Sequence, residues 1–377
     1  MKIAIIQRKY AHFRVGLLEY IAQENPDYTV DLIHHGKKQN SKLINEIVVP
    51  TKEKNIKAFG KKYNLVFSFD ILKTLKQNKY DLLILEGTTN ILNNILIYLY
   101  CLKTKTPYIW WGAGRRVGAP MTLLRKLAHP FIKHIKRNAS ACLAYSTVAE
   151  TYMKEVIGVK EEKVFVTQNT LNVSQIDDNS KMFNEEDIVK LKESLGLKEQ
   201  NIILYVGAIE ERKRIKDLID AFEGIKGNGA LVLVGDGPYM PELKEIVGNS
   251  NKKENIYIVG EVIEGVDIYF KMCDIFILPS EGGLALNQAM AHRKVIISSS
   301  ADGTERDLIE NGFNGYLFNE GDIVQLGQIL EGLVLKDKEE LTLMGINSRI
   351  IIDSRVNEQN FNKEFSRAIN YVEKNMK

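Results

Sequence analysis

The chain has 377 residues, of which 45% are apolar and 26% are charged, and this composition excludes disordered, collagen-like and low-complexity proteins. A chain of this length is expected to form two domains. The net charge of +3 hides an asymmetry: residues 1–170 carry 27 Lys and Arg against 13 Asp and Glu, and residues 171–377 carry 24 against 35. The first half should therefore attract an anionic partner, though no nucleic acid, because motifs for nucleic-acid binding are missing.

No apolar stretch reaches about 18 residues, so the sequence predicts no membrane span. The first residues pass directly into a strand-like run, without the cleavage site of a signal peptide. The three cysteines fit no metal site by their spacing. We therefore expect a cytoplasmic protein whose cysteines are reduced and lie in the core.

Short runs rich in Ile, Val, Leu and Tyr alternate with helical patterns, which predicts βα units and parallel sheets. In the first half the predicted strands are Ile3–Gln7, Thr29–His35, Tyr80–Glu86, Tyr108–Gly112, Ala141–Ser146 and Lys163–Asn169. In the second half they are Asn201–Gly207, Ala230–Gly235, Ile256–Gly260, Ile275–Pro279, Lys294–Ser299 and Gly315–Phe318. The predicted fold is α/β, with two doubly wound Rossmann-like domains, residues 1–172 and 173–355. A last helix, residues 356–377, could pack back on either domain, the N-terminal one being favoured.

Ligands of doubly wound sheets bind beyond the carboxyl ends of the strands, so the loops after the strands are the candidate sites. The strand Asn201–Gly207 is followed by a basic turn, Arg212, Lys213 and Arg214, and then by a helical pattern. The amides of a helix start and fixed positive charges together suit a diphosphate. The alternative is a solvated surface turn.

Three further strand ends in the second half carry glycines and polar side chains. Gly235 and Gly237 let the backbone approach a ligand closely. Glu281 puts a carboxylate where a polyhydroxyl ligand could bind, and Gln288, on the helix that follows, faces the same crevice. The other residues of these strand-end sites are Gly207, Gly282, Gly283, Leu284, Gly303 and Thr304.

The order and spacing of these motifs resemble the donor domain of glycosyltransferase family 4, the retaining glycosyltransferases with the two-domain GT-B fold. The resemblance covers residues 205–318, and weaker similarity extends over the first half. The matching segments are Tyr205–Gly207, Lys213, Leu218–Phe222, Leu233–Pro238, Asp274–Ser280, Gln288–Ala291 and Asn311–Phe318.

The resemblance implies two domains facing across a cleft and the transfer of a sugar from a nucleotide diphospho-sugar, with retention and without metal or cofactor. It implies that Lys213 binds the departing diphosphate, where preorganised positive charge stabilises the transition state. It assigns the donor sugar to Glu281, the ribose to Gln288, and the loop near the phosphates to Gly303 and Thr304. Lys213 and Glu281 are thus the predicted catalytic residues.

The chain departs from the family pattern in the donor half. Ala208 stands where the family has a phosphate-binding Arg, so Arg212 or Arg214 is the hypothetical replacement. Gln288 stands where the family has the second of two Glu, one residue nearer to Glu281 than the family spacing.

In the first half, residues 11–15 and 110–114 resemble acceptor-side segments of a polysaccharide-assembling subgroup of the family. That subgroup often has a His where this chain has Ala113, so no protein-supplied base is expected, and the departing phosphate can take the acceptor proton. The acceptor-side candidates are His12, Arg14, Gly114 and Arg115. The alternative for His12 is an ordinary surface histidine.

The segment Arg115–Arg137 holds seven Lys and Arg and no acid, with apolar residues between them at helical spacing. It is predicted to form a basic amphipathic helix on an anionic membrane surface, where each basic residue contributes roughly 1 kcal/mol. The alternative is a helix whose apolar face belongs to the core. A lipid-linked acceptor, such as a polyprenyl diphosphate oligosaccharide, would suit such a surface.

Together these features predict a hexosyltransferase in the cytoplasm, peripheral at the inner face of the membrane. It would move a sugar from a nucleotide-sugar, a UDP-sugar being favoured, to a lipid-linked glycan in surface polysaccharide biosynthesis. One alternative is a catalytically degenerate relative that binds or scaffolds an active transferase, for which Ala208, Gln288 and Ala113 argue. Another is an enzyme of the same fold with a different reaction, such as a nucleotide-sugar epimerase.

Overall fold

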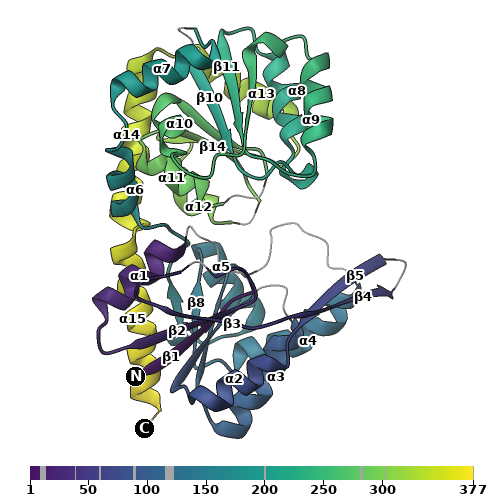
Figure 1. The fold of residues 1–377 in the computed structure, drawn as a ribbon, viewed down its shortest axis with the longest axis vertical. Helices are drawn as coiled ribbons and strands as arrows, with labels where there is room; N and C mark the ends of the chain where they lie inside the picture. Colours follow the sequence, from purple (N-terminus) through teal and green to yellow (C-terminus); the bar gives the residue numbers. More distant parts are fainter. Residues whose placement is uncertain are drawn as a thin grey trace. The chain divides into compact units, whose positions relative to one another are not determined.

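The computed structural model describes residues 1–8, 14–38, 40–58, 61–87, 91–114, 123–198, 201–280, 283–301 and 303–376, without the side chains of 53–66, 91, 123–125 and 127. The chain forms two compact units (Figure 1). Unit 1 comprises Met1–Asn172 and Glu358–Lys377, and unit 2 comprises Val173–Asn357. Unit 2 is therefore one continuous segment inserted into unit 1.

Unit 1 is built on a seven-stranded parallel sheet with the order β3-β2-β1-β6-β7-β8-β9 (Figure 1). Its strands are β1 (Lys2–Ile6), β2 (Thr29–His34), β3 (Asn45–Val48), β6 (Leu82–Glu86), β7 (Tyr108–Gly112), β8 (Ala141–Ala144) and β9 (Val164–Val166). Successive side chains alternate between two buried faces: Ile3 and Ile5 pack on one, and Ala4 and Ile6 on the other. Burial on both faces explains why the central strands are continuous apolar runs.

Helices cover both faces of this sheet. One face is covered by α1 (Val15–Glu24) and α15 (Glu358–Asn375), and the other by α2 (Asp70–Asn78), α3 (Ile91–Thr104), α4 (Leu123–Arg137) and α5 (Thr147–Thr151) (Figure 1). In α15 the apolar residues Phe361, Phe365 and Ile369 recur every four positions and are buried against the sheet of unit 1. The C-terminal helix thus supplies part of the core of unit 1.

Three strands of unit 1 are missing from the sequence-based prediction. They are the edge strand β3 and an antiparallel two-stranded ribbon of β4 (Lys52–Ala58) and β5 (Lys61–Phe67). Lysines and asparagines interrupt the apolar residues of the ribbon, so no buried run marks either strand in the sequence.

Unit 2 is built on a six-stranded parallel sheet with the order β12-β11-β10-β13-β14-β15. Its strands are β10 (Asn201–Val206), β11 (Gly229–Val234), β12 (Ile256–Gly260), β13 (Ile275–Leu278), β14 (Val295–Ser299) and β15 (Gly315–Phe318). Each agrees with its predicted strand to within one residue at either end.

Nine helices are described in unit 2. Figure 1 shows α8, α9 and α13 on one side of the sheet and α10, α11 and α14 on the other. The bounds are α6 (Val173–Ser180), α7 (Glu185–Leu195), α8 (Ile215–Gly224), α9 (Met240–Asn249), α10 (Asp267–Met272), α11 (Ala285–Ala291), α12 (Glu305–Leu308), α13 (Ile323–Val334) and α14 (Lys338–Arg355). A polar, acidic stretch starts this unit, and in it Asn184 and Asp187 form a reciprocal hydrogen-bonded cap at the beginning of α7.

Two parallel sheets with helices on both faces confirm the predicted α/β fold class of two Rossmann-like domains. None of the helices in the described residues is long and apolar enough to cross a membrane. Cys101, Cys142 and Cys273 are buried and unpaired, as predicted. Burial raises the pKa of each thiol to about 12.

Candidate functional site

The carboxyl edge of the unit 2 sheet contains the point at which the strand order reverses. β10 lies at this point, with β11 on one side and β13 on the other. The loops that leave such a point in opposite directions open a crevice, in which ligands of this architecture bind. The predicted donor residues follow β10, β11, β13 and β14, so the topology gathers them at one edge of one sheet.

Glycines let the loops after β10 and β11 pack backbone against backbone. The Gly207 N–H donates to the Val234 carbonyl at 3.0 Å. Gly235 has a φ of +141°, and a Cβ there would lie 1.9 Å from the carbonyl oxygen of Gly207. A Cβ at Gly237 would lie 2.3 Å from the carbonyl oxygen of Ile209. These positions require glycine, and the loop backbone is left without side chains at the mouth of the crevice.

The basic turn after β10 is partly neutralised by neighbouring acids. Arg212 is ion-paired with Glu210, and the Arg214 guanidinium donates to Asp217 at 2.7 Å. Either arginine would have to exchange its carboxylate for a phosphate before it could replace the family Arg. Lys213 is half-buried on the same turn, and Arg214 separates it from the first residue of α8, Ile215.

The turn after β13 is described only in part. Glu281 and Gly282 lie outside the described residues, so the role of Glu281 stays a prediction. Gly283 is exposed, and Leu284 is buried at the start of α11. Ser280, at the strand end, is 1% exposed, and its hydroxyl has no hydrogen-bond partner within the described residues.

A buried acid that the sequence does not reveal holds Gln288. The Gln288 amide nitrogen donates to Asp267 Oδ1 at 2.9 Å, and His292 Nε2 lies 2.8 Å from the same oxygen. Burial alone would raise the pKa of the Asp267 carboxyl, but hydrogen bonds from His292 and Gln288 outweigh burial and lower it. Gln288 and His292 are four residues apart, which is the one sequence signal that they share a helix face.

The loop after β14 is shaped by Glu305, to which the sequence pattern assigns no role. Its buried carboxylate accepts from the Ala301 N–H at 2.7 Å and from the Gly303 N–H at 3.0 and 3.1 Å. Gly303 has a φ of +94°, and Thr304 directly precedes α12. One carboxylate therefore holds the amides of two described residues of the predicted phosphate-side loop, Ala301 and Gly303.

Two of the four acceptor-side candidates, His12 and Arg115, lie outside the described residues. Gly114 follows β7 with a φ of +80°, and a Cβ there would lie 3.3 Å from the Cα of Ala149. Gln7 ends β1 on the same carboxyl edge of the unit 1 sheet. It is 2% exposed, and neither of its amide atoms has a partner in the described part of the chain.

Arg14, the fourth candidate, belongs to a half-buried three-residue network. It donates to Glu86 Oε1 at 3.0 Å and to the Tyr145 hydroxyl at 3.1 Å, and that hydroxyl donates to the same Glu86 oxygen at 3.0 Å. The guanidinium also lies 5.3 Å from the ring centroid of Trp111. Burial alone would lower the pKa of Arg14, but Tyr145 and Glu86 outweigh burial and raise it. Arg14 is thus charged and already neutralised by Glu86.

The predicted basic helix is described only from residue 123 onward, as α4. Lys126 and Arg137 are exposed, but Lys136 is 6% exposed, and its ammonium group lies 5.2 Å from the ring centroid of Trp110. Burial lowers the pKa of Lys136 to about 8. The expectation that Lys136 faces a membrane is therefore wrong, because helical spacing alone placed a core lysine on the basic face.

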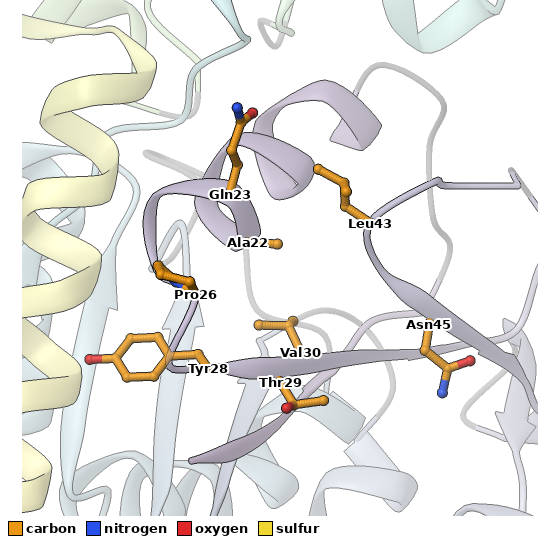
Figure 2. Close-up of a pocket in the computed structure, with 8 residues that line it drawn as sticks. All are labelled: Ala22, Gln23, Pro26, Tyr28, Thr29, Val30, Leu43 and Asn45. Atoms are coloured by element: carbon orange, nitrogen blue, oxygen red, sulfur yellow. The ribbon is translucent and has the colours of Figure 1, made fainter.

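Two hollows in the described part of the chain contain none of the predicted site residues. In unit 1 a hollow of about 460 Å³ lies at the start of β2, beside Thr29 and Val30, with Ala22 and Gln23 of α1 above it (Figure 2). In unit 2 a groove of about 660 Å³ lies between α8 and α13. The described residues also contain no group of three or more His, Cys, Asp or Glu that could hold a metal ion.

The comparison with protein-family models concerns unit 2. Residues 187–350 match the family model of glycosyl transferases group 1. The match lies inside unit 2 and covers less than half of the chain. It supports the family that the motifs between residues 205 and 318 predict.

Curated relatives carry related names over part of their length. Alpha-D-kanosaminyltransferase of Streptomyces kanamyceticus is 27% identical over 207 residues, which are 52% of this chain and 52% of that protein. Alpha-monoglucosyldiacylglycerol synthase of Acholeplasma laidlawii is 29% identical over 148 residues, 37% of each chain. The chain thus spans about half, or less, of the length of these relatives.

Solved structures extend the likeness to the whole fold. HepE of Anabaena, crystallised in complex with UDP, has a TM-score of 0.77 and 17% identity, and the match covers 98% of this chain and 100% of that one. At this identity the likeness shows the fold alone, but it shows it for unit 1 as well as for unit 2.

Proposed function

We propose that this protein is a retaining hexosyltransferase that uses a nucleotide diphospho-sugar, most favourably a UDP-sugar, to glycosylate a lipid-linked glycan for surface polysaccharide biosynthesis. The observation that carries this function is the reversal of strand order at β10, where a basic turn and glycine-packed loops lie together. The group 1 glycosyl transferase match and the likeness to the UDP complex of HepE support it.

Each donor residue then has a chemical task. Lys213, beside the start of α8, would stabilise the negative charge that develops on the departing diphosphate. Gly235 and Gly237 would let backbone N–H groups approach the nucleotide closely. Glu281 would bind the sugar and Gln288 the ribose, in a reaction that needs neither a metal ion nor a cofactor.

The acceptor side depends on the positive charge of unit 1. Exposed basic residues of α4, such as Lys126 and Arg137, would attract an anionic membrane surface. This contact would keep the enzyme in the cytoplasm at the inner face of the membrane, close to a lipid-linked acceptor. The relative named alpha-monoglucosyldiacylglycerol synthase supports a lipid acceptor.

Lys213→Ala tests the proposed donor site. Without the charged contact, UDP affinity, measured by calorimetry, should fall about tenfold to a hundredfold, and turnover of UDP-glucose should be lost. Lys216→Ala is the matched control, because Lys216 is exposed and paired with Asp220 at 2.8 Å. Wild-type affinity and turnover in the Lys213 variant would remove this residue from the site, and a wild-type protein that binds no nucleotide would contradict the function itself.

A catalytically degenerate binding partner is the second candidate. Ala208 favours it, and so do the ion pairs that occupy Arg212 and Arg214. It predicts UDP binding without release of UDP from UDP-glucose, with or without a glycan acceptor. Sugar transfer or donor hydrolysis above background excludes it.

A further inference from the structure

The side chain of Gln288 is hydrogen-bonded to a buried acid, Asp267, and a buried histidine, His292, contacts the same acid. Asp267 Oδ1 accepts from the Gln288 amide nitrogen at 2.9 Å and contacts His292 Nε2 at 2.8 Å. The side chains of Asp267 and His292 are only 7% and 3% exposed. The His292 ring also stacks on Phe270, with ring centroids 5.6 Å apart and an angle of 8° between the planes. The acid therefore has little freedom to move away from Gln288.

The chemistry of this contact decides which end of the amide faces outward. A glutamine side chain carries a donor and an acceptor and can present either one to a ligand. An ionised carboxylate can only accept, so it selects the NH₂ end of Gln288 as its partner. The lowered pKa of Asp267 keeps the carboxyl ionised at neutral pH. With the NH₂ end of half-buried Gln288 bound to Asp267, the carbonyl oxygen is the end of the amide that remains for a ligand.

We propose that Asp267, backed by His292, is a positioning residue that makes Gln288 a fixed hydrogen-bond acceptor for a ribose hydroxyl. The protein would then select ribonucleotides over their deoxy analogues. This role rests on the proposed function, because it requires a nucleotide at the carboxyl edge of unit 2. It also accounts for a glutamine where the resembling family has a glutamate: a carboxylate accepts in any orientation, whereas an amide accepts only when it is held.

Three variants isolate the positioning role. His292→Phe keeps the stacking on Phe270 and the bond between Asp267 and Gln288. Asp267→Leu/His292→Phe removes the acceptor of the Gln288 amide together with the histidine that contacts this acceptor, so the amide can rotate. Adding Gln288→Glu to this double variant supplies a hydrogen-bond acceptor that needs no positioning. The probes are UDP, 2′-deoxy-UDP and 3′-deoxy-UDP, and the readout is calorimetric affinity, with circular dichroism as the check on folding.

The wild type and His292→Phe should bind UDP about tenfold more tightly than at least one deoxy analogue, as expected for one hydrogen bond. In Asp267→Leu/His292→Phe the ratio of the affinity for UDP to the affinity for that deoxy analogue should fall to near one, while the affinity for the deoxy analogue stays unchanged. Gln288→Glu in that background should restore the ratio. Gln288→Leu alone, which leaves Asp267 and His292 in contact, should abolish the ratio and serves as an independent measurement if the double variant does not fold.

Four results would overturn the positioning role. Two concern the affinity ratio itself: a wild type that binds UDP and both deoxy analogues equally tightly, and a ratio that survives in either Asp267→Leu/His292→Phe or Gln288→Leu. The other two are equal losses of affinity for UDP and its deoxy analogues in the double variant, and no recovery of the ratio when Gln288→Glu is added. Equal losses would mean that Asp267 only supports the fold. A wild type that binds none of the three nucleotides would instead contradict the proposed use of a UDP-sugar.

Discussion

A glutamate at position 288 would turn the contact with Asp267 from attraction into repulsion. Gln288→Glu is best made in the His292→Phe background, because His292 contacts the same oxygen of Asp267 at 2.8 Å and its removal leaves the two carboxylates as the contact to be measured. The atoms now in contact are 2.9 Å apart. Two carboxylates at about 4 Å repel by about 4 kcal/mol at an effective dielectric constant of about 20. Binding one proton at pH 7 relieves the repulsion, and this costs about 3.7 kcal/mol for a carboxyl with an ordinary pKa of about 4.3. Unit 2 should therefore lose about 3 to 4 kcal/mol of stability at pH 7.

The pH dependence of this loss identifies its cause. Repulsion raises the folded-state pKa of the carboxyl pair above the unfolded value, so the folded variant binds the extra proton. The destabilisation should then grow as the pH rises from about 4.3 through the folded-state pKa, and it should be only about 1 kcal/mol at pH 5. Urea unfolding followed by circular dichroism, with the His292→Phe parent as reference, measures the difference. A loss of stability of less than about 1 kcal/mol at pH 7 would refute the electrostatic reasoning, and so would a loss at pH 5 that equals the loss at pH 7. Asp267→Asn, whose amide can donate to the new glutamate, should restore stability.

Three other changes have expected outcomes. Gly235→Ala brings a Cβ against the Gly207 carbonyl and should cost at least about 2 kcal/mol, seen as a lower thermal midpoint, whereas Gly248→Ala meets no atom and should cause no loss. Because the Lys136 pKa is lowered to about 8, the unfolded chain binds a proton that the folded protein lacks. Wild-type stability should therefore rise relative to Lys136→Met between about pH 8 and about pH 10, and parallel pH profiles would contradict this. Gln7→Leu removes two buried atoms that have no partner among the described residues, and it should stabilise unit 1 by about 1 to 3 kcal/mol in chemical denaturation; destabilisation would mean that Gln7 has a native partner.

The sequence predicts strands well where both faces of the strand are buried. β11 and β13 are continuous apolar runs between turns, and no helical pattern competes with them. The ribbon of β4 and β5 lacks such a run, and its lysines match neither a buried strand nor an amphipathic helix. Periodicity reports burial, so it cannot reveal strands that pair outside the main sheet.

The residues of the candidate site also divide into those that the sequence reveals and those that it does not. Gly235 and Gly237 are recognisable in the sequence because a strand end and a close backbone approach both favour glycine. Asp267 and Glu86 are not, because each meets its partner through the folding of separate βα units: Asp267 contacts a residue 21 positions away, and Glu86 one 72 positions away. A charged residue that serves another side chain has the same local sequence as one on the surface.

The path of the chain between its two units has a consequence for biosynthesis. Unit 2 is one uninterrupted segment and needs no residue beyond position 357 to fold, but unit 1 also needs α15. Until α15 is available, the first 172 residues expose an apolar sheet face, which Phe361 and Phe365 cover in the folded unit. A ribosome that stops before α15 would release a folded unit 2 joined to an aggregation-prone half-domain.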